Sequence, residues 1–141
     1  MTLMEIRALC VTPFTLSTRR ELIMRSLEAM CTTLSIALVK ADVWVDGSFL
    51  TQKIEPDDVD VLVVLPSGVN GTPEQRAAIK RVDDQDFAFP IKCDSYTTIE
   101  YPRGHKKYWF GEYARAYWLR QFGFARTNAM KGIAVIGTPL T

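Results

Sequence analysis

The sequence has little of several residue types that often mark a functional site. It holds one histidine and three cysteines in 141 residues. Cys10, Cys31 and Cys93 are odd in number and form no Cys-x-x-Cys pair, which disfavours both a disulfide framework and a zinc site. We therefore expect free thiols and a reducing, cytoplasmic location.

Long apolar runs are also missing. No stretch approaches the ~20 apolar residues of a membrane span, and the N-terminus lacks the basic-then-apolar layout of a signal peptide. We see neither internal repeats nor linkers, so we expect one domain over residues 1–141 and no membrane partner. Apolar residues make up 48% of the chain and charged residues 23%, which is typical of a globular domain with a core.

Several common catalytic motifs are absent as well. The turn at 68–71, Gly-Val-Asn-Gly, lacks the lysine of a Walker A loop. No G-x-S-x-G elbow occurs, and residues 58–68 do not place ligands as an EF-hand does. The single histidine, His105, would allow a Ser–His–Asp triad with Ser48 on paper only, and we expect it at the surface.

The stretch from Val43 to Leu65 predicts two strands joined by a tight connection. Residues 43–46 alternate apolar and polar or aromatic side chains, as a strand does. Gly47-Ser48 then breaks this strand. Asp58-Val59-Asp60 opens a second strand that continues as an apolar run to Leu65, as a buried central strand would.

Two acids at the start of the second strand indicate a metal site. Asp58 and Asp60 are two residues apart, so both carboxylates leave the same face, with backbone positions roughly 6.6 Å apart. Such a pair can share divalent cations, since paired catalytic metals sit ~3.5–4 Å apart. Oxygen ligands favour Mg²⁺ or Mn²⁺. Gly47 lacks a Cβ, so a phosphate can approach its backbone, and Ser48 adds a hydroxyl and an N–H.

At these residues the chain resembles the DNA polymerase β-like nucleotidyltransferases. Their signature is an apolar residue, then Gly with Gly or Ser, a spacer, and acid–apolar–acid. Here the spacer runs from Phe49 to Asp57, and it is short, as in the minimal nucleotidyltransferases. The pattern looks closer still to a group of small bacterial proteins of that superfamily. The residues that carry this second likeness are Trp44, Asp46-Gly47-Ser48-Phe49, Thr51, Lys53, Pro56, Asp58-Val59-Asp60 and Lys131-Gly132-Ile133.

The resemblance implies a metal-dependent transfer of a nucleotidyl group from an NTP to a protein or RNA acceptor. Asp58, Asp60 and Asp94 would hold Mg²⁺ or Mn²⁺ and carry the chemistry. In that superfamily the third acid lies on the strand after the acid pair, and Asp94 is the one acid within that predicted strand. Gly47 and Ser48 would bind the nucleotide, with Lys53 touching its phosphates. Likeness to minimal nucleotidyltransferases also suggests a toxin–antitoxin or defence pair with a partner protein.

The rest of the pattern predicts an α/β (α+β) domain, with a small mixed sheet flanked by helices. We expect helices over 18–39, 72–82 and 108–121. The first should begin with a capping box of Thr18 and Glu21 and carry a buried stripe that includes Leu38. The second should begin with Thr72 as N-cap. Strands are expected over 89–99 and 131–136, the latter at a sheet edge. Residues 1–15 fit either a short strand or an extended arm.

Charge is uneven along the chain. Residues 42–60 hold six acids and one base, whereas 103–141 hold seven Lys or Arg and one acid. That suits a polyphosphate substrate, although the bases also fit a solvated helix face. Trp109, Tyr113 and Tyr117 share one side of the last helix. Rings interleaved with Lys and Arg suit stacking on bases, but we expect these to pack on the sheet. The alternative function is a non-catalytic binding module of the same fold, either an antitoxin-like partner or a nucleic-acid binder.

Overall fold

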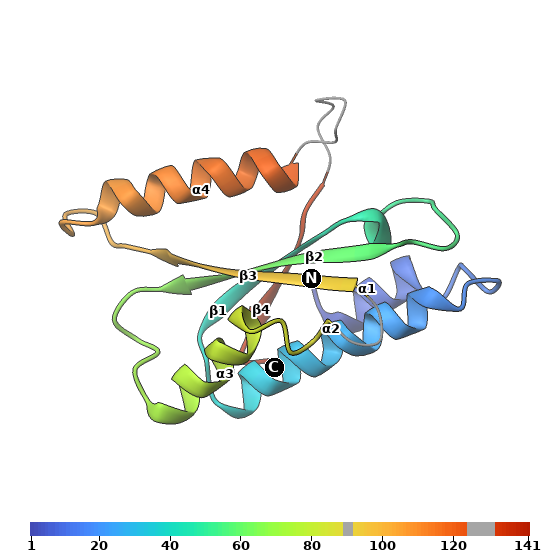
Figure 1. Ribbon diagram of the computed structural model, residues 1–141, viewed down its shortest axis with the longest axis horizontal. Helices are drawn as coiled ribbons and strands as arrows, with labels where there is room; N and C mark the ends of the chain where they lie inside the picture. Colours follow the sequence, from blue (N-terminus) through green and yellow to red (C-terminus); the bar gives the residue numbers. More distant parts are fainter. Residues whose placement is uncertain (89–91, 124–131) are drawn as a thin grey trace.

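The computed structural model describes residues 1–88, 92–123 and 132–141 and confirms the predicted α+β class. One four-stranded mixed sheet has helices on both of its faces (Figure 1). None of the helices in these residues is long and apolar enough to cross a membrane. In chain order the elements are α1 (Leu3–Cys10), α2 (Arg19–Ile36), β1 (Ala41–Asp46), the 3-10 helix η1 (Ser48–Leu50), β2 (Asp58–Pro66), α3 (Pro73–Asp83), β3 (Lys92–Glu100), α4 (Tyr108–Gly123) and β4 (Ala134–Thr138).

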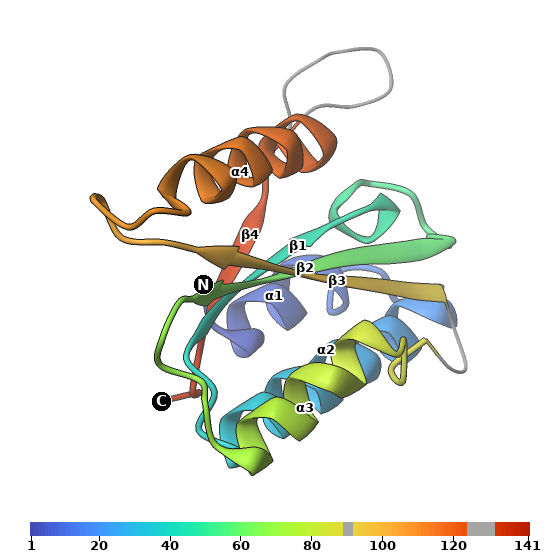
Figure 2. The same ribbon diagram turned by 60° about the vertical axis from the view of Figure 1, so that its left-hand side comes forward.

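The strands lie in the order β3-β2-β1-β4 (Figure 2). β1 is antiparallel to both β2 and β4, whereas β2 and β3 are parallel. Because parallel neighbours need a long crossover, α3 connects β2 to β3. In this strand order β2 and β1 occupy the two central positions. Both strands belong to the predicted strand–turn–strand stretch.

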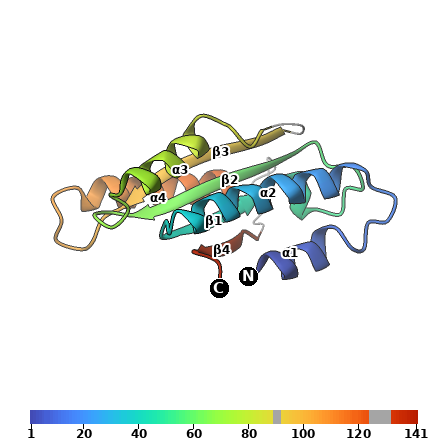
Figure 3. The same cartoon turned by 90° about the horizontal axis from the view of Figure 1, so that it is seen from below.

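The two faces of the sheet are covered differently. α1, α2 and α3 lie on one face and α4 on the other (Figure 3). Val43, Val45, Val61 and Val63 are fully buried in the larger core beside the first three helices. The alternate positions of the same strands join a smaller cluster with Phe122 of α4. The period of two along β1 and β2 thus decides which side chains face α4.

The first residues of the chain form a helix, so the expected strand or extended arm is wrong. The Thr2 hydroxyl accepts a hydrogen bond from the Glu5 N–H, and the Glu5 carboxylate accepts one from the Thr2 N–H. This reciprocal capping box begins α1. Ile6 and Cys10, four residues apart, are buried, while Ala8 between them is exposed, which is a helical rather than a strand pattern.

The predicted capping box at the start of α2 is also wrong. Thr18 makes no side-chain cap; its hydroxyl and its N–H both donate to Glu55 instead. The Ser17 hydroxyl accepts from the Arg20 N–H. The helix ends at Ile36, because Leu38 adopts a left-handed φ of 59°, and Leu38 is consequently exposed rather than part of the buried stripe.

The remaining boundaries follow the sequence more closely. α3 begins with Thr72 as N-cap and Pro73 at its first position, as predicted. β3 is described from Lys92 to Glu100; the predicted residues 89–91 lie outside the described part of the chain. β4 lies at the sheet edge, as predicted, although it begins at Ala134, and residue 131 lies outside the described part.

The aromatic stripe of α4 does not pack on the sheet, contrary to the prediction. Trp109 is 77% exposed and Tyr113 is 81% exposed. The side chains that α4 turns toward the sheet are instead Trp118 and Phe122, which join the smaller cluster with Trp44. The helix carries large apolar residues on more than one side, so its periodicity does not identify the inner side.

A buried arginine holds the connection between β1 and β2. Arg20 of α2 is only 1% exposed. Its guanidinium lies 3.5 Å from the centre of the Phe14 ring and donates to the carbonyls of Cys10 (2.8 Å) and Phe49 (2.7 Å). It also donates to the carbonyl oxygens of three further residues, namely Thr51, Lys53 and Ile54. Burial lowers the pKa of this guanidinium, and carbonyl dipoles take the place of a carboxylate partner.

We predict that Arg20→Met destabilises the fold by roughly 3 kcal/mol or more, because several buried carbonyls would lose a charged donor worth ~1.5–3 kcal/mol each. Arg25→Met is the matched control: Arg25 lies on the same helix, is largely exposed and, among the described residues, forms an ion pair only with Glu21, at 3.3 Å. It should change stability by no more than ~0.5 kcal/mol. Urea unfolding measures both, and equal effects would show that Arg20 does not hold this connection.

Candidate active site

Three acids line up across three neighbouring strands. Asp60 of β2 is paired in register with Asp46 at the end of β1 and with Asp94 of β3. Paired residues on adjacent strands lie on the same face, about 4.8 Å apart along the sheet. We call Asp46, Asp60 and Asp94 the acid row. Their positions alternate with the valines of the larger core, so the row lies on the α4 face.

The sequence placed Asp58, Asp60 and Asp94 as one set, and the sheet brings all three to one face. Asp58 precedes Asp60 by two residues on β2 and so shares its face. The sequence reasoning did not count Asp46 as a site residue, although it is 3% exposed and lies beside Asp60. Its signal was the alternation of Trp44 and Asp46 with Val43 and Val45, which places the Asp46 carboxylate on the α4 face with Trp44.

The oxygen-only chemistry of these acids fits Mg²⁺ or Mn²⁺. The positions of the acid side chains fit a bound metal ion less completely. Among residues 1–88, 92–123 and 132–141, no three His, Cys, Asp or Glu side chains are grouped closely enough to hold an ion. One oxygen of Asp58 accepts from the Ser48 hydroxyl at 3.0 Å and from the Ser48 N–H at 3.4 Å. An ion shared between Asp58 and Asp60 would require Asp58 to give up these Ser48 contacts.

Gly47 lets the connection approach the acid-bearing strand closely. Its φ of 98° lies in the region that favours glycine. A Cβ placed there would lie 3.1 Å from the Asp60 nitrogen and from the Val59 Cα, and 3.2 Å from the Asp58 oxygen. The Gly47-Ser48 backbone is therefore pressed against the first residues of β2. η1, which follows, is a single turn, and its Ser48 N–H is directed at Asp58.

Lys53 lies in the same connection but is directed elsewhere. Its ammonium pairs with Asp57 at 2.5 Å, and both side chains are more than half exposed. No contact joins Lys53 to the acid row among the described residues. Solvent screens such a pair strongly, so the ammonium can exchange Asp57 for another anion at little cost.

A cavity of about 240 Å³ lies beside two acids of the row. Asp46, Asp60 and Tyr96 line it from the sheet, and Tyr117 and Trp118 line it from α4. The Trp118 ring centre lies 5.1 Å from those of both Tyr96 and Tyr117. Planar rings beside carboxylates can accept a flat, polar ligand, because one face stacks while the edge meets hydrogen-bond acceptors.

Cysteine and histidine chemistry does not contribute to this site. The three cysteines are free, as the sequence predicted, and all three are buried. Burial, together with the negative charges of Asp94 and Asp60, raises the pKa of the Cys93 thiol to about 12, so it stays protonated at neutral pH. His105 is exposed and its ring lies 4.8 Å from that of Tyr101. None of its described contacts involves Ser48, and no triad is formed.

Fold and site together define a small α+β domain whose mixed sheet presents acids beneath an aromatic helix. The chain belongs to a family of unknown function, DUF6932, which it matches over residues 1–137. No curated protein and no solved structure matches it. Because the function of this family is unknown, the function proposed below is inferred from the residues of the site.

We predict that Gly47→Ala destabilises the protein by about 2–4 kcal/mol, because it combines a left-handed backbone cost of ~1–2 kcal/mol with a crowded Cβ. Gly68→Ala is the matched control, since Gly68 has a φ of 78° but nothing within 4 Å of its Cβ position. The Gly68→Ala variant should lose only the ~1–2 kcal/mol that a left-handed backbone costs a residue with a Cβ. The difference in urea unfolding free energy measures the close approach to β2, and equal losses would mean that Gly47 is not pressed against it.

Proposed function

We propose that the protein is a metal-dependent nucleotidyltransferase, which moves a nucleotidyl group from an NTP to a protein or RNA acceptor. One observation carries the proposal: Gly47 packs on the backbone of Asp58 to Asp60, and Asp60 is paired with Asp94 on the next strand. The proximity of this Gly-Ser turn to three acids on two neighbouring strands supports a site for a triphosphate with its metal. The resemblance of the Gly-Ser and Asp-x-Asp motifs to those of DNA polymerase β-like enzymes supports the same conclusion.

In this proposal Asp58, Asp60 and Asp94 hold Mg²⁺ or Mn²⁺. The bound cation would neutralise negative charge on the phosphates as the transfer proceeds. Gly47 and Ser48 contact the triphosphate through backbone N–H groups and the hydroxyl. Lys53, once it exchanges its exposed partner Asp57, adds positive charge to that contact.

The chemistry proposed for the side chains is a single displacement at the α-phosphorus. An acceptor hydroxyl oxygen forms the new P–O bond, and the bond to pyrophosphate breaks. Asp94 accepts the hydroxyl proton, acting as the general base at the acceptor side of the site. Tyr96, Tyr117 and Trp118 offer a stacking surface to the base of the nucleotide. Asp46 contributes a further acceptor beside Asp60.

The proposed setting is a cytoplasmic pair of the toxin–antitoxin or defence type. The three free thiols suit a reducing compartment. The partner protein in such a pair is either the acceptor or the antagonist of the enzyme. Its identity, the NTP and the acceptor are to be found by the labelling experiment below.

We predict that Asp60→Asn abolishes metal-dependent labelling of acceptors by an α-labelled NTP, with a loss of at least about 100-fold. The fold should remain intact, because the substitution keeps the size of a side chain that is only partly buried. Thermal stabilisation by Mg²⁺ plus NTP should disappear too, since that shift requires binding to the native state. Each NTP is tested with cell lysate as the source of acceptors.

Asp42→Asn is the matched control for this experiment. Asp42 is exposed on the same strand as Asp46, but it is paired with Val64 at the opposite end of β1. Its variant should keep both labelling and the thermal shift. If the wild-type protein gives neither labelling nor a thermal shift with any NTP, the alternative of a non-catalytic binding module replaces the enzyme.

A further inference from the structure

The outer side of α4 carries a row of exposed aromatic rings. Trp109, Phe110, Tyr113 and Tyr117 are 77%, 74%, 81% and 52% exposed. Trp109, Tyr113 and Tyr117 follow one another at intervals of four residues, so they lie along one side of the helix, ~6 Å apart along its axis. Exposed apolar patches of this kind mark binding surfaces.

These rings are not needed to hold α4 in place. The helix packs through a different side, where Trp118 and Phe122 meet the sheet and Gly111 lies against the end of β3. A Cβ at Gly111 would lie 3.2 Å from the Tyr101 ring and 3.4 Å from the Ile99 carbonyl oxygen. The inner contacts thus fix the helix, and the outer rings are left for another molecule.

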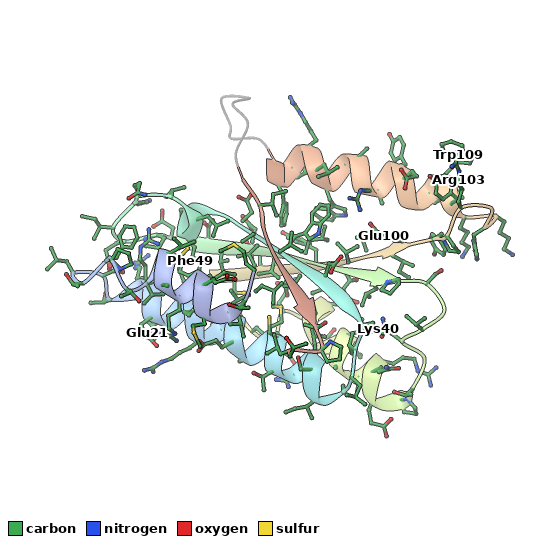
Figure 4. All side chains as sticks on the ribbon, turned by 180° about the vertical axis from the view of Figure 1, so that it is seen from behind. Glu21, Lys40, Phe49, Glu100, Arg103 and Trp109 are labelled. Atoms are coloured by element: carbon green, nitrogen blue, oxygen red, sulfur yellow. The ribbon has the colours of Figure 1, made fainter. Side chains whose placement is uncertain are left out.

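The charge around the rings identifies that molecule. Residues 103–123 hold five Lys or Arg and a single acid, Glu112. Arg103, Lys106 and Lys107 make no ion pair within the described part of the chain. Figure 4 shows Arg103 and Trp109 at the same end of α4. Protein interfaces are depleted in lysine, whereas rings interleaved with cations are typical of surfaces that bind single-stranded nucleic acid.

We propose that α4 and the turn before it bind a single-stranded nucleic acid. Bases stack on Trp109 and Tyr113, while Arg103, Lys106 and Lys107 contact the phosphates. A duplex hides its base faces and would not fit. Tyr117, one turn further along the same side, lines the cavity that holds Asp60, so the bound strand leads toward the acid row. That this strand is the acceptor rests on the proposed function; the binding itself does not.

The test is fluorescence anisotropy with labelled RNA and DNA strands of about 12 nucleotides, without NTP and in EDTA, so that it is independent of catalysis. Trp109→Ala with Tyr113→Ala removes two stacking rings and should weaken binding by at least roughly 30-fold. Lys106→Ala with Lys107→Ala should weaken it and make the slope of log K against log salt shallower by about 1.4. Ile36→Ala, at an apolar residue of α2 that is 80% exposed, and Arg76→Ala on α3 should leave binding unchanged.

Three results would overturn the proposal. The first is no binding of either strand at low salt. The second is binding that the ring variants leave unchanged or that a duplex of the same sequence matches. The third is a wild-type dimer that Trp109→Ala converts to monomers without any strand binding, which would make the rings a protein interface. Binding of RNA, of DNA or of both, lost in the ring variants, supports it.

Discussion

The register of β2 against its two neighbours is the constraint on which the rest of the structure depends. β2 is paired with β1 on one side and with β3 on the other. Because side chains alternate along a strand, a slip of one residue would turn Asp58 and Asp60 into the larger core and Val59 and Val61 out of it. Burial of those valines therefore fixes the acids on the α4 face. The same pairing places Asp94 and Asp46 beside Asp60.

A second constraint fixes the connection between β1 and β2, the two strands that carry Asp46, Asp58 and Asp60. Residues 47–57 have little regular structure of their own beyond η1, and short irregular segments are usually mobile. Here the guanidinium of Arg20 donates hydrogen bonds to carbonyl groups of this connection. Gly47 lets its backbone approach the backbone of β2 closely. The positions of Ser48 and of the acids are thus set by packing and by buried hydrogen bonds. Such preorganisation is what a phosphate-binding turn requires.

The sequence alone predicted those features that depend on residues close together in the chain. The alternation in 43–46 and the apolar run after Asp60 gave β1, β2 and the shared face of the acids. Thr72-Pro73 gave the start of α3. Asp46 was not counted, because its place in the acid row depends on pairing between strands rather than on its neighbours in sequence. Likewise, nothing near Arg20 in the sequence indicates that four of its five carbonyl partners lie 29 to 34 residues away.

The errors have similar causes. In α1, Ile6, Ala8 and Cys10 allowed a strand, but the Thr2–Glu5 capping box and burial of Ile6 against the core favour a helix. In α4, periodicity located an aromatic stripe without showing its direction. Both sides of that helix carry rings, and the close contact at Gly111 decides which side lies inward. The exposed stripe is a departure from ordinary patterning, and such departures are expected where a protein binds something.

The central claim is that Asp58, Asp60 and Asp94 form one cation and nucleotide site beside Gly47-Ser48. The most direct test is a crystal structure with Mn²⁺ and an NTP analogue that resists cleavage between the α- and β-phosphates, with the metal located by its anomalous signal. The account predicts Mn²⁺ bound by the Asp58 and Asp60 carboxylates, with Asp94 at its acceptor side and the triphosphate against the Gly47-Ser48 backbone. Mn²⁺ and nucleotide bound elsewhere, with Asp58 still bonded to Ser48 at saturating concentrations of both, would contradict it.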